Sequence, residues 1–308
     1  MILTDIGLLL AGLCLLFVGG EALVRGAVSL ANRLRLPHLV IGLTVVGFGT
    51  SMPELLVSVQ AAVDGHSDIA VGNVVGSNVA NILLILGLSA IIAPVLARIP
   101  GIARDVAVMM IAAVVMLGLA FVGGVGPILG MVMVAALCAY IIYVAVAGRR
   151  ETKLAPALKG RLPALLEAAA LAGGLVALIG GAHLLVTSSI SIARAVGVSE
   201  AVIGLTIVAV GTSLPELAAS IVAAYRGQSE VAVGNVVGSN IFNILGILGL
   251  TAIVRPIRIS SEMATFDVPT MVAISALLAV ALLAMGKLNR SVAAFFLVGY
   301  AAYVVALF

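Results

Sequence analysis

Two acidic side chains lie in apolar surroundings, and each directly follows a proline. Glu54 ends the sequence GTSMPE at 49–54, and Glu216 ends GTSLPE at 211–216. Proline has no amide hydrogen and its ring clashes with the preceding turn, so a helix breaks or kinks there and a backbone carbonyl loses its donor. That carbonyl, the carboxylate and the neighbouring hydroxyls are hard oxygen donors, which Ca²⁺ prefers and which suit Na⁺ for the same reason. The pattern therefore predicts cation binding.

A second motif follows each glutamate, GNVVGSN at 72–78 and again at 234–240. Its two glycines are four residues apart, so one helix face is bare and a neighbouring backbone can approach closely. A serine and an asparagine four residues apart also share one helix face in each copy. These are the next candidate ligands: Ser77, Asn81, Ser239 and Asn243. The other asparagines are expected to serve structure: Asn73, Asn78, Asn235 and Asn240.

Both motifs belong to a segment that occurs twice. Residues 42–88 and 204–250 align without a gap at a constant offset of 162 positions, with 31 identities over 47 positions. Two copies in an apolar chain are typical of transporters built from repeats, whose site lies at the interface of the copies. A carboxylate at the bilayer centre costs at least ~2.5 kcal/mol. Two at equivalent positions therefore favour a functional site over a kink with an incidental glutamate held by hydroxyls.

The composition is that of an integral membrane protein. Of the 308 residues, 63% are hydrophobic and 9% are charged, and the mean hydropathy is +1.32, whereas soluble domains have about 25% charged residues. A span needs roughly 20 apolar residues. We expect an all-α membrane protein, two inverted five-helix repeats with broken helices at the ion site. The ten expected spans are about 5–31, 39–63, 70–93, 104–122, 126–147, 164–194, 201–225, 230–253, 264–286 and 291–308.

The connectors predict the domains and the topology. We expect a first repeat over 1–147, a basic linker over 148–163 and a second repeat over 164–308. Basic residues on alternate sides number twelve against three, the smaller set being Arg194, Arg255 and Arg258. The positive-inside rule puts the larger set and the linker in the cytoplasm and both termini outside. Because five is odd, the second repeat enters the membrane the other way up, so the two glutamates meet near the midplane.

Five residues in apolar runs lie outside the motifs. Glu21 and Arg25 are four residues apart on one predicted helix and are expected to form an ion pair. His183 has no partner motif and is expected to be a packed or rim histidine. Cys14 and Cys138 stand alone and are expected to be small core residues rather than a disulfide or a metal pair.

At its two motifs the sequence strongly resembles the sodium/calcium exchanger branch of the Ca²⁺/cation antiporter superfamily, and the resemblance extends over the whole predicted architecture. It implies a secondary active antiporter, of the short type found in prokaryotic cell membranes, that exchanges Ca²⁺ for Na⁺ by alternating access. By this resemblance Glu54 and Glu216 bind Ca²⁺ beside the carbonyls of Thr50 and Thr212. The Na⁺ ligands that it implies are Ser51, Ser77, Ser213, Ser239 and the carbonyls of Gly47 and Ala209.

The same resemblance bears on mechanism. It implies that the helices near 5–31 and 164–194 slide past the core. Proton-coupled relatives tend to carry a Glu-His pair where this chain has Gly-Ser at 76–77 and 238–239, which favours Na⁺ as the driving ion. Asn243 stands where some relatives have an aspartate, which leaves two site carboxylates. The implied partners are the transported ions and the lipid bilayer, with no cofactor, no nucleic acid and no obligate protein partner.

Three other functions compete with Na⁺/Ca²⁺ exchange. The first is an antiporter of Ca²⁺, or another divalent cation, for H⁺, in which the glutamates are protonated. The second is a passive cation channel with the two glutamates as a selectivity ring. The third is an intramembrane enzyme, in which Ser51 or Ser213 as nucleophile would need a base, and neither motif contains a histidine. We expect no enzymatic activity.

Overall fold

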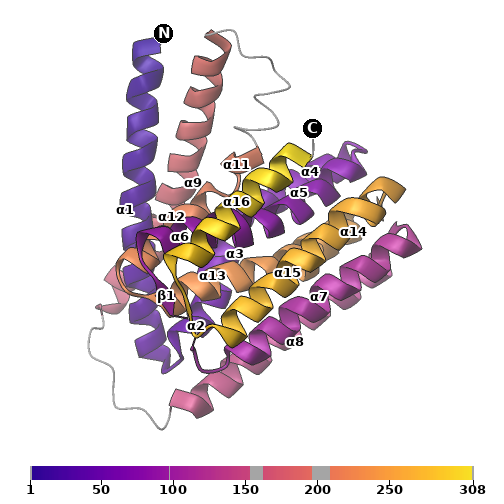
Figure 1. Ribbon diagram of the computed structural model, residues 1–308. Helices are drawn as coiled ribbons and strands as arrows, with labels where there is room; N and C mark the ends of the chain where they lie inside the picture. Colours follow the sequence, from indigo (N-terminus) through magenta and orange to yellow (C-terminus); the bar gives the residue numbers. More distant parts are fainter. Residues whose placement is uncertain (1, 97, 153–161, 196–208, 307–308) are drawn as a thin grey trace.

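The computed structural model describes residues 2–96, 98–152, 162–195 and 209–306, and these are almost entirely helical (Figure 1). The elements of the first half are α1 (Ile2–Leu34), α2 (His38–Ile41), η1 (Gly42–Val46), α3 (Gly47–Thr50), α4 (Met52–Val63), α5 (Ser67–Ala80), η2 (Asn81–Ile85), α6 (Leu86–Ile92), β1 (Val95–Leu96), α7 (Ile102–Val122), β2 (Gly124–Val125) and α8 (Pro127–Thr152). Those of the second half are α9 (Ala164–Ala195), α11 (Ala209–Gly211), α12 (Leu214–Tyr225), α13 (Ser229–Ile241), η4 (Phe242–Leu248), α14 (Gly249–Val254), β3 (Ile257–Arg258), η5 (Met263–Asp267), α15 (Val268–Ala284), β4 (Lys287–Leu288) and α16 (Arg290–Ala306).

Within the described residues, seven helices are long and apolar enough to cross a membrane, or eight if the bent pair His38–Thr50 and Met52–Val63 is one span. The helices Leu214–Tyr225 and Arg290–Ala306 are apolar but shorter. The chain is thus a multi-pass, predominantly helical membrane protein, while ten spans remain a prediction. Most of the expected linker, at 153–161, and the first part of the expected seventh span, at 201–208, lie outside the described residues.

Helices α1 and α9 lie side by side and project beyond the other helices (Figure 1). A Cβ atom on Gly12 would lie 2.8 Å from the carbonyl oxygen of Gly181, and one on Gly19 would lie 2.9 Å from that of Gly174. Small residues at such crossings let two backbones touch, which is how helices associate in lipid. The two helices therefore pack as a close pair.

Polar contacts join this pair at both of its ends. Ser29 Oγ of α1 donates to Glu167 Oε2 of α9 over 2.5 Å, and Arg33 Nε also donates to Glu167, over 2.8 Å. At the other end Ser191 Oγ of α9 donates to Asp5 Oδ2 of α1 over 2.8 Å. Asp5 and Glu167 occupy equivalent positions at the offset of 162, so the two ends are joined in the same way.

Two short antiparallel ladders connect the halves of the chain. Strand β1 pairs with β4, where Val95 lies opposite Leu288, and β2 pairs with β3, where Val125 lies opposite Ile257. Val95 and Ile257 are equivalent positions of the repeat. The sequence predicts only helices here, because two-residue strands are far shorter than the alternating apolar pattern by which a strand is recognised.

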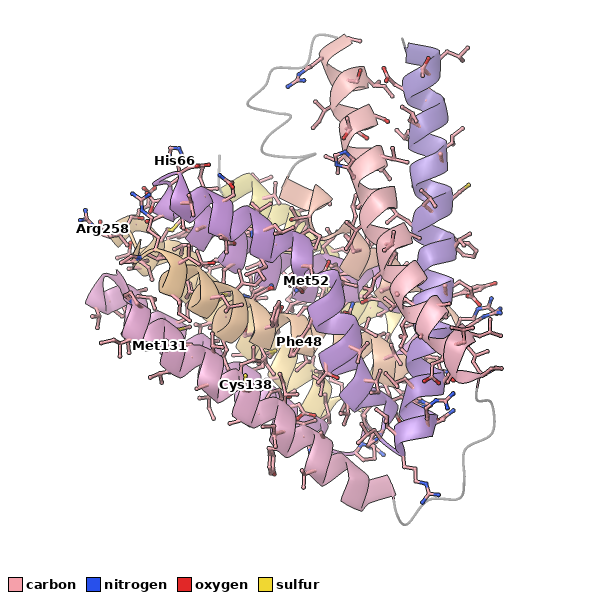
Figure 2. All side chains as sticks on the ribbon, turned by 180° about the vertical axis from the view of Figure 1, so that it is seen from behind. Phe48, Met52, His66, Met131, Cys138 and Arg258 are labelled. Atoms are coloured by element: carbon pink, nitrogen blue, oxygen red, sulfur yellow. The ribbon has the colours of Figure 1, made fainter. Side chains whose placement is uncertain are left out.

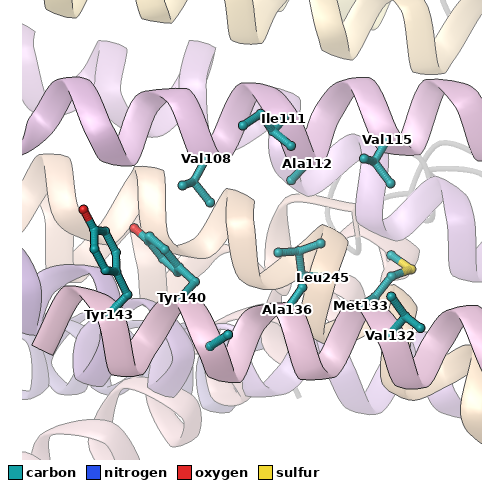
Figure 3. Close-up of a pocket in the computed structure, with 11 residues that line it drawn as sticks. Val108, Ile111, Ala112, Val115, Val132, Met133, Ala136, Tyr140, Tyr143 and Leu245 are labelled. Carbon is teal, nitrogen blue, oxygen red and sulfur yellow. The ribbon is translucent and has the colours of Figure 1, made fainter. Parts of the chain in front are cut away.

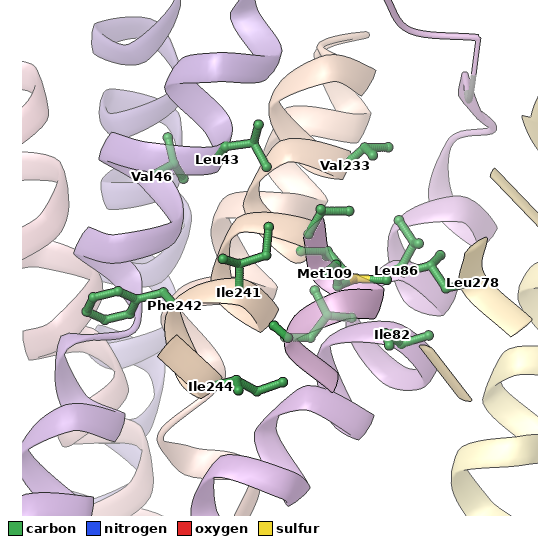
Figure 4. Packing of buried hydrophobic residues seen from close by; sticks show 14 of the residues in the cluster. Leu43, Val46, Ile82, Leu86, Met109, Val233, Ile241, Phe242, Ile244 and Leu278 are labelled. Atoms are coloured by element: carbon green, nitrogen blue, oxygen red, sulfur yellow. The ribbon is translucent and has the colours of Figure 1, made fainter. Parts of the chain in front are cut away.

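The centre of the molecule is α13 together with η4. Every residue of η4, and all of α13 except its second residue, Glu230, is buried. Figure 4 shows this segment surrounded by apolar side chains of other elements, among them Leu43 of η1, Ile82 of η2 and Met109 of α7. A Cβ on Gly238 would lie 2.3 Å from the carbonyl oxygen of Leu43, so the close backbone approach expected at this motif glycine is confirmed.

The prediction that the cysteines are core residues is wrong. Cys14 and Cys138 are both free and exposed, and Figure 2 shows Cys138, like Met131, on the outer side of α8. Lipid is as apolar as a protein core, so the composition of a membrane helix does not distinguish its lipid face from its packed face.

Candidate cation site

Each glutamate is placed by a break in a helix. Helix α3 ends at Thr50, Ser51 takes a non-helical conformation, and α4 begins at Met52 with an axis turned by 46°. In the second half, α11 ends at Gly211 and α12 begins at Leu214. Pro53 and Pro215 stand in the first turn of the new helices, where a missing amide hydrogen costs nothing. The expected breaks are thus confirmed.

The breaks place Glu54 in the first turn of α4 and Glu216 in the first turn of α12, and each glutamate is only 1% exposed. A helix N-terminus favours negative charge, which lowers the cost of burying a carboxylate. Each carboxylate accepts a hydrogen bond from the break of the other copy, so the two negative charges lie in one buried region and repel one another. A divalent cation between them would offset both the burial and the repulsion.

The two copies of the motif meet through reciprocal hydrogen bonds. Ser51 Oγ donates to Glu216 Oε1 over 2.7 Å, and Ser213 Oγ donates to Glu54 Oε1 over 3.1 Å. Each serine thus contacts the glutamate of the other copy. The site is therefore shared between the halves of the chain, as the repeat predicts.

Two asparagines of the second motif hold the backbone at the glutamates. Asn73 Nδ2 lies 3.0 Å from the carbonyl oxygen of Glu54 and 2.9 Å from Ser58 Oγ. In the other half Asn235 Nδ2 lies 3.2 Å from the carbonyl oxygen of Glu216 and 2.8 Å from Ser220 Oγ. Their role is structural. The sequence analysis missed both serines, although each copy carries a serine four residues after its glutamate, which was the available signal.

Further predicted ligands lie around Ser51. Ser51 Oγ is 3.0 Å from Ser239 Oγ, which in turn donates to the carbonyl oxygen of Gly47 over 3.2 Å. Thr50 is fully buried, and its hydroxyl donates to the carbonyl oxygen of Val46 over 3.0 Å. The hydroxyls of Ser51 and Ser239 and the carbonyl of Gly47 therefore form one cluster that joins the two copies.

The remaining predicted serine, threonine and carbonyl ligands lie in the second break, in α5 and in α11. Thr212 lies beside Glu54 in the second break. Ser77 is buried in α5, four residues before Asn81. Ala209 is the first described residue after the gap at 196–208, and it begins α11, the short helix that leads into the second break.

Asn81 and Asn243 lie in π-helical segments, which the sequence analysis did not foresee. Asn81 begins η2, and Asn243 is the second residue of η4. Such segments widen the helix by one residue and frequently occur at functional sites. Asn81 Nδ2 donates to Asn240 Oδ1 over 3.0 Å, which joins the two copies a second time.

Several buried oxygens in this region have no donor within the described part of the chain. They include Glu54 Oε2, Glu216 Oε2, Asn81 Oδ1 and Asn243 Oδ1. Buried polar atoms in proteins are nearly always hydrogen-bonded, and an unsatisfied one costs about 1–3 kcal/mol. Orphaned oxygens on four predicted ligands, two from each copy, fit a bound cation.

The donor set decides which cations fit. No group of three or more His, Cys, Asp or Glu side chains that could hold a metal ion occurs in the ranges described. The candidate ligands are two carboxylates with hydroxyl, amide and carbonyl oxygens. Such a set suits hard cations such as Ca²⁺ and Na⁺ rather than the transition metals that prefer imidazole or thiolate.

An apolar groove between α7 and α8 is separate from these ligands. It has a volume of about 490 Å³, with Leu245 of η4 at its floor (Figure 3). Tyr140 and Tyr143 stand at one end, and none of its lining residues is charged. This groove offers no ligands for a cation.

Comparisons with known proteins agree with one another. The model of the sodium/calcium exchanger protein family matches residues 4–147 and again residues 166–308. The sodium/calcium exchanger MaX1 of Methanosarcina acetivorans is 33% identical over an alignment covering 100% of this chain and 99% of that protein. The inner membrane protein YrbG of Escherichia coli is 33% identical over 88% of this chain and 86% of that protein. A solved structure of the sodium-calcium exchanger NCX_Mj, soaked with 2.5 mM Na⁺ and 0.1 mM Ca²⁺, superposes with a TM-score of 0.88 at 31% identity over 100% of both chains.

Proposed function

This chain belongs to the sodium/calcium exchanger family and is a cation antiporter of the membrane rather than an enzyme, and from that premise we propose that it exchanges Ca²⁺ for Na⁺ by alternating access. The observation that carries the proposal is the set of orphaned oxygens on Glu54, Glu216, Asn81 and Asn243. These four side chains come from equivalent positions of the two copies, and all four are buried.

The proposed ligands divide between the two ions. Ca²⁺ is bound by Glu54 and Glu216 with the carbonyls of Thr50 and Thr212, and the two asparagine oxygens complete this set. Na⁺ is bound by the serine hydroxyls and by two carbonyls: Ser51, Ser77, Ser213, Ser239, Gly47 and Ala209. The reciprocal contacts of Ser51 and Ser213 with the two carboxylates support a set that both ions share.

Charge balance explains why the fluxes would be coupled. Two carboxylates neutralise one Ca²⁺ or two Na⁺, so one site accepts either load. Competition for shared ligands couples the two fluxes without a second energy source. An empty site would carry two negative charges, which are costly to move through a dry barrier, so only the loaded carrier crosses easily.

We propose ten spans in two inverted repeats, over residues 1–147 and 164–308, joined by a cytoplasmic linker at 148–163 in the cell membrane. The family model matches the chain twice, once in each half. There are two ladders and two Ser–Glu contacts. In each case the second is the first with the roles of the two halves of the chain interchanged. Both observations support a two-fold relation between the repeats.

Radiolabelled Ca²⁺ uptake into proteoliposomes tests the exchange. Vesicles are loaded with Na⁺ or with choline at matched pH. Uptake is expected only with internal Na⁺, because without it the antiporter has no counter-ion. Glu54→Gln and Glu216→Gln are each expected to abolish uptake, since either removes one of the two charges that balance Ca²⁺. Glu262→Gln is the matched control and should leave uptake unchanged, because Glu262 is exposed and outside the site.

The other outcomes are equally definite. Uptake driven by an imposed pH gradient and indifferent to Na⁺ would establish Ca²⁺/H⁺ exchange instead. Uptake that continues without any counter-ion inside the vesicle would identify a passive channel. Retention of full uptake by both glutamine variants would reject the site itself.

A further inference from the structure

The two halves differ in how the α1–α9 pair touches the core. Helix α1 packs directly on α12, where a Cβ on Gly20 would lie 3.0 Å from Val222 Cγ2. Val222 is only 3% exposed as a result. The next residue, Glu21, accepts a hydrogen bond from Arg226 Nε over 2.7 Å, at the end of α12. Its predicted ion pair with Arg25 on its own helix is confirmed.

The equivalent face of α4 is not covered in this way. At the offset of 162, Leu56 corresponds to Ala218 and Gln60 to Val222. Leu56 is 71% exposed and Gln60 is also exposed. Helix α4 runs from Met52 toward His66 and away from the α1–α9 pair (Figures 1 and 2). The pair therefore covers α12 and leaves α4 open.

The offset of 162 positions also gives the equivalents of Glu21 and Arg226 in the other half. Glu21 corresponds to His183 on α9, and Arg226 corresponds to Asp64 at the end of α4. Both His183 and Asp64 are exposed, and Asp64 accepts hydrogen bonds from Gln60 of its own helix. Each half thus has one acidic and one basic side chain at equivalent positions, with the acid and the base exchanged between the two helices. Only the Glu21–Arg226 pair is in contact in this conformation.

In a carrier made of inverted repeats, alternating access is largely the movement of one part against the other around a fixed site. Each half then adopts in turn the conformation that the other half has now. In the opposite conformation α9 would cover α4, and α1 would leave α12. That movement would bring His183 toward Asp64 and part Glu21 from Arg226.

We propose that Glu21–Arg226 and His183–Asp64 are alternating ion pairs, each holding one of the two conformations of the exchange cycle. This inference rests on the proposed function, since it needs alternating access. The contacts described for these four residues do not involve the cation ligands, so they act as positioning residues. Exposed or half-exposed ion pairs are weak, which suits contacts that must break in every cycle.

The two pairs differ in the cations that surround them. Glu21 is bonded by two guanidinium groups, those of Arg25 and Arg226. The equivalent of Arg25 is the uncharged Thr187. The cation beside Asp64 is instead Arg255, which donates to the carbonyl oxygen of the preceding residue, Val63.

Cysteine cross-linking in the full-length chain tests the proposal. In a background with Cys14→Ala and Cys138→Ala, one variant carries His183→Cys with Asp64→Cys, and its cross-linking rate reports closure over α4. Adding Glu21→Gln is expected to raise that rate roughly threefold, the size expected for loss of a weak ion pair. Arg226→Gln removes the same ion pair from the other side and should raise the cross-linking rate by a similar factor. Either variant can therefore replace the other if one of them folds poorly.

Glu262→Gln is the control for a change of charge elsewhere and should leave the rate unchanged. A rate that neither Glu21→Gln nor Arg226→Gln alters would overturn the proposal, as would a complete absence of cross-linking at the 183–64 pair. The readout does not depend on transport. A protein that cross-links as expected and fails to exchange Ca²⁺ for Na⁺ would refute the ion assignment alone, whereas exchange without a change in cross-linking would refute this inference alone.

Discussion

At the scale of single residues, Asn73 and Asn235 decide where the glutamates sit. Each amide bridges a glutamate carbonyl and a serine hydroxyl in the first turns after the break. Because these contacts fix the backbone rather than the carboxylate, they orient the ligand without competing for its charge. Pre-positioned ligands lower the ordering cost of binding.

Replacing Asn235 by alanine should therefore weaken Ca²⁺ binding although both carboxyl groups are retained. The buried carbonyl of Glu216 and the hydroxyl of Ser220 would each lose a partner, at a cost of about 1–3 kcal/mol. If half of that cost falls on binding, the Ca²⁺ concentration for half-maximal uptake rises roughly threefold to tenfold. The measurement is a Ca²⁺ titration of Na⁺-dependent uptake.

Asn73→Ala is the matched variant and should behave in the same way, because it occupies the equivalent position and makes the equivalent contacts. Asn289→Ala is the control, since Asn289 caps a backbone amide away from the site. An unchanged half-maximal concentration in both site variants would show that the breaks hold their shape without these amides.

The sequence singles out the residues that meet at the two helix breaks, whereas it does not predict their contacts. A glutamate after a proline, repeated at a fixed offset, is a local pattern that identifies Glu54 and Glu216. That Ser51 would bond Glu216, and not Glu54 three residues away, depends on how distant helices pack. Such contacts join residues 165 positions apart, and no local pattern encodes them.

At the scale of elements, the α1–α9 pair depends on glycines where the backbones cross. A Cβ on Gly174 would lie 2.7 Å from the backbone nitrogen of Leu23, whereas one on the adjacent Gly173 would meet nothing within 4 Å in the described residues. Glycine inside a helix otherwise costs roughly 0.5–1 kcal/mol relative to alanine. Replacement by alanine should therefore lower the stability of the protein at Gly174 and not at Gly173.

Gly174→Ala is expected to destabilise the protein, because the new methyl group overlaps backbone atoms that cannot rotate away. Overpacking of this kind costs about 1–3 kcal/mol. Gly173→Ala should be neutral or slightly stabilising. The stability of both variants is measured by heating the detergent-solubilised protein. The readout is the fraction of protein recovered from size-exclusion chromatography after heating. Equal recovery of the two variants would contradict the close packing of α1 on α9.

Helices were more predictable than the departures from them. Long apolar runs indicate spans, and the prolines indicate the breaks. The π-helical segments η1, η2 and η4 add single residues to turns that retain an ordinary helical sequence. Helix propensity does not distinguish a π-helical turn from an α-helical one, so the sequence does not predict where these segments occur.

At the scale of the whole molecule, the two ladders and the two Ser–Glu contacts relate the halves by the offset of 162. The packing of α1 on α12 departs from this symmetry, because the equivalent face of α4 is left open. A symmetric sequence in an asymmetric conformation is what alternating access needs. The repeat predicts the symmetry, whereas which half is closed is a property of the conformation.

The orientation of the molecule in the membrane can be tested independently of transport. The proposed ten spans with a basic central linker would place both termini outside, because Lys and Arg concentrate on the side that we assign to the cytoplasm. Alkaline phosphatase fused after Phe308 should therefore be active, and green fluorescent protein at the same place should be dark. Fusions after Gly148, where five spans have been made, should give the reverse result and serve as the control. A fluorescent C-terminal fusion would contradict the proposed topology, and the Gly148 fusion would then show how. If the Gly148 fusion is fluorescent as well, the second half makes an even number of spans and two five-span repeats are wrong. If the Gly148 fusion is instead active as alkaline phosphatase, the whole protein is inserted the other way up and the repeats remain inverted relative to one another.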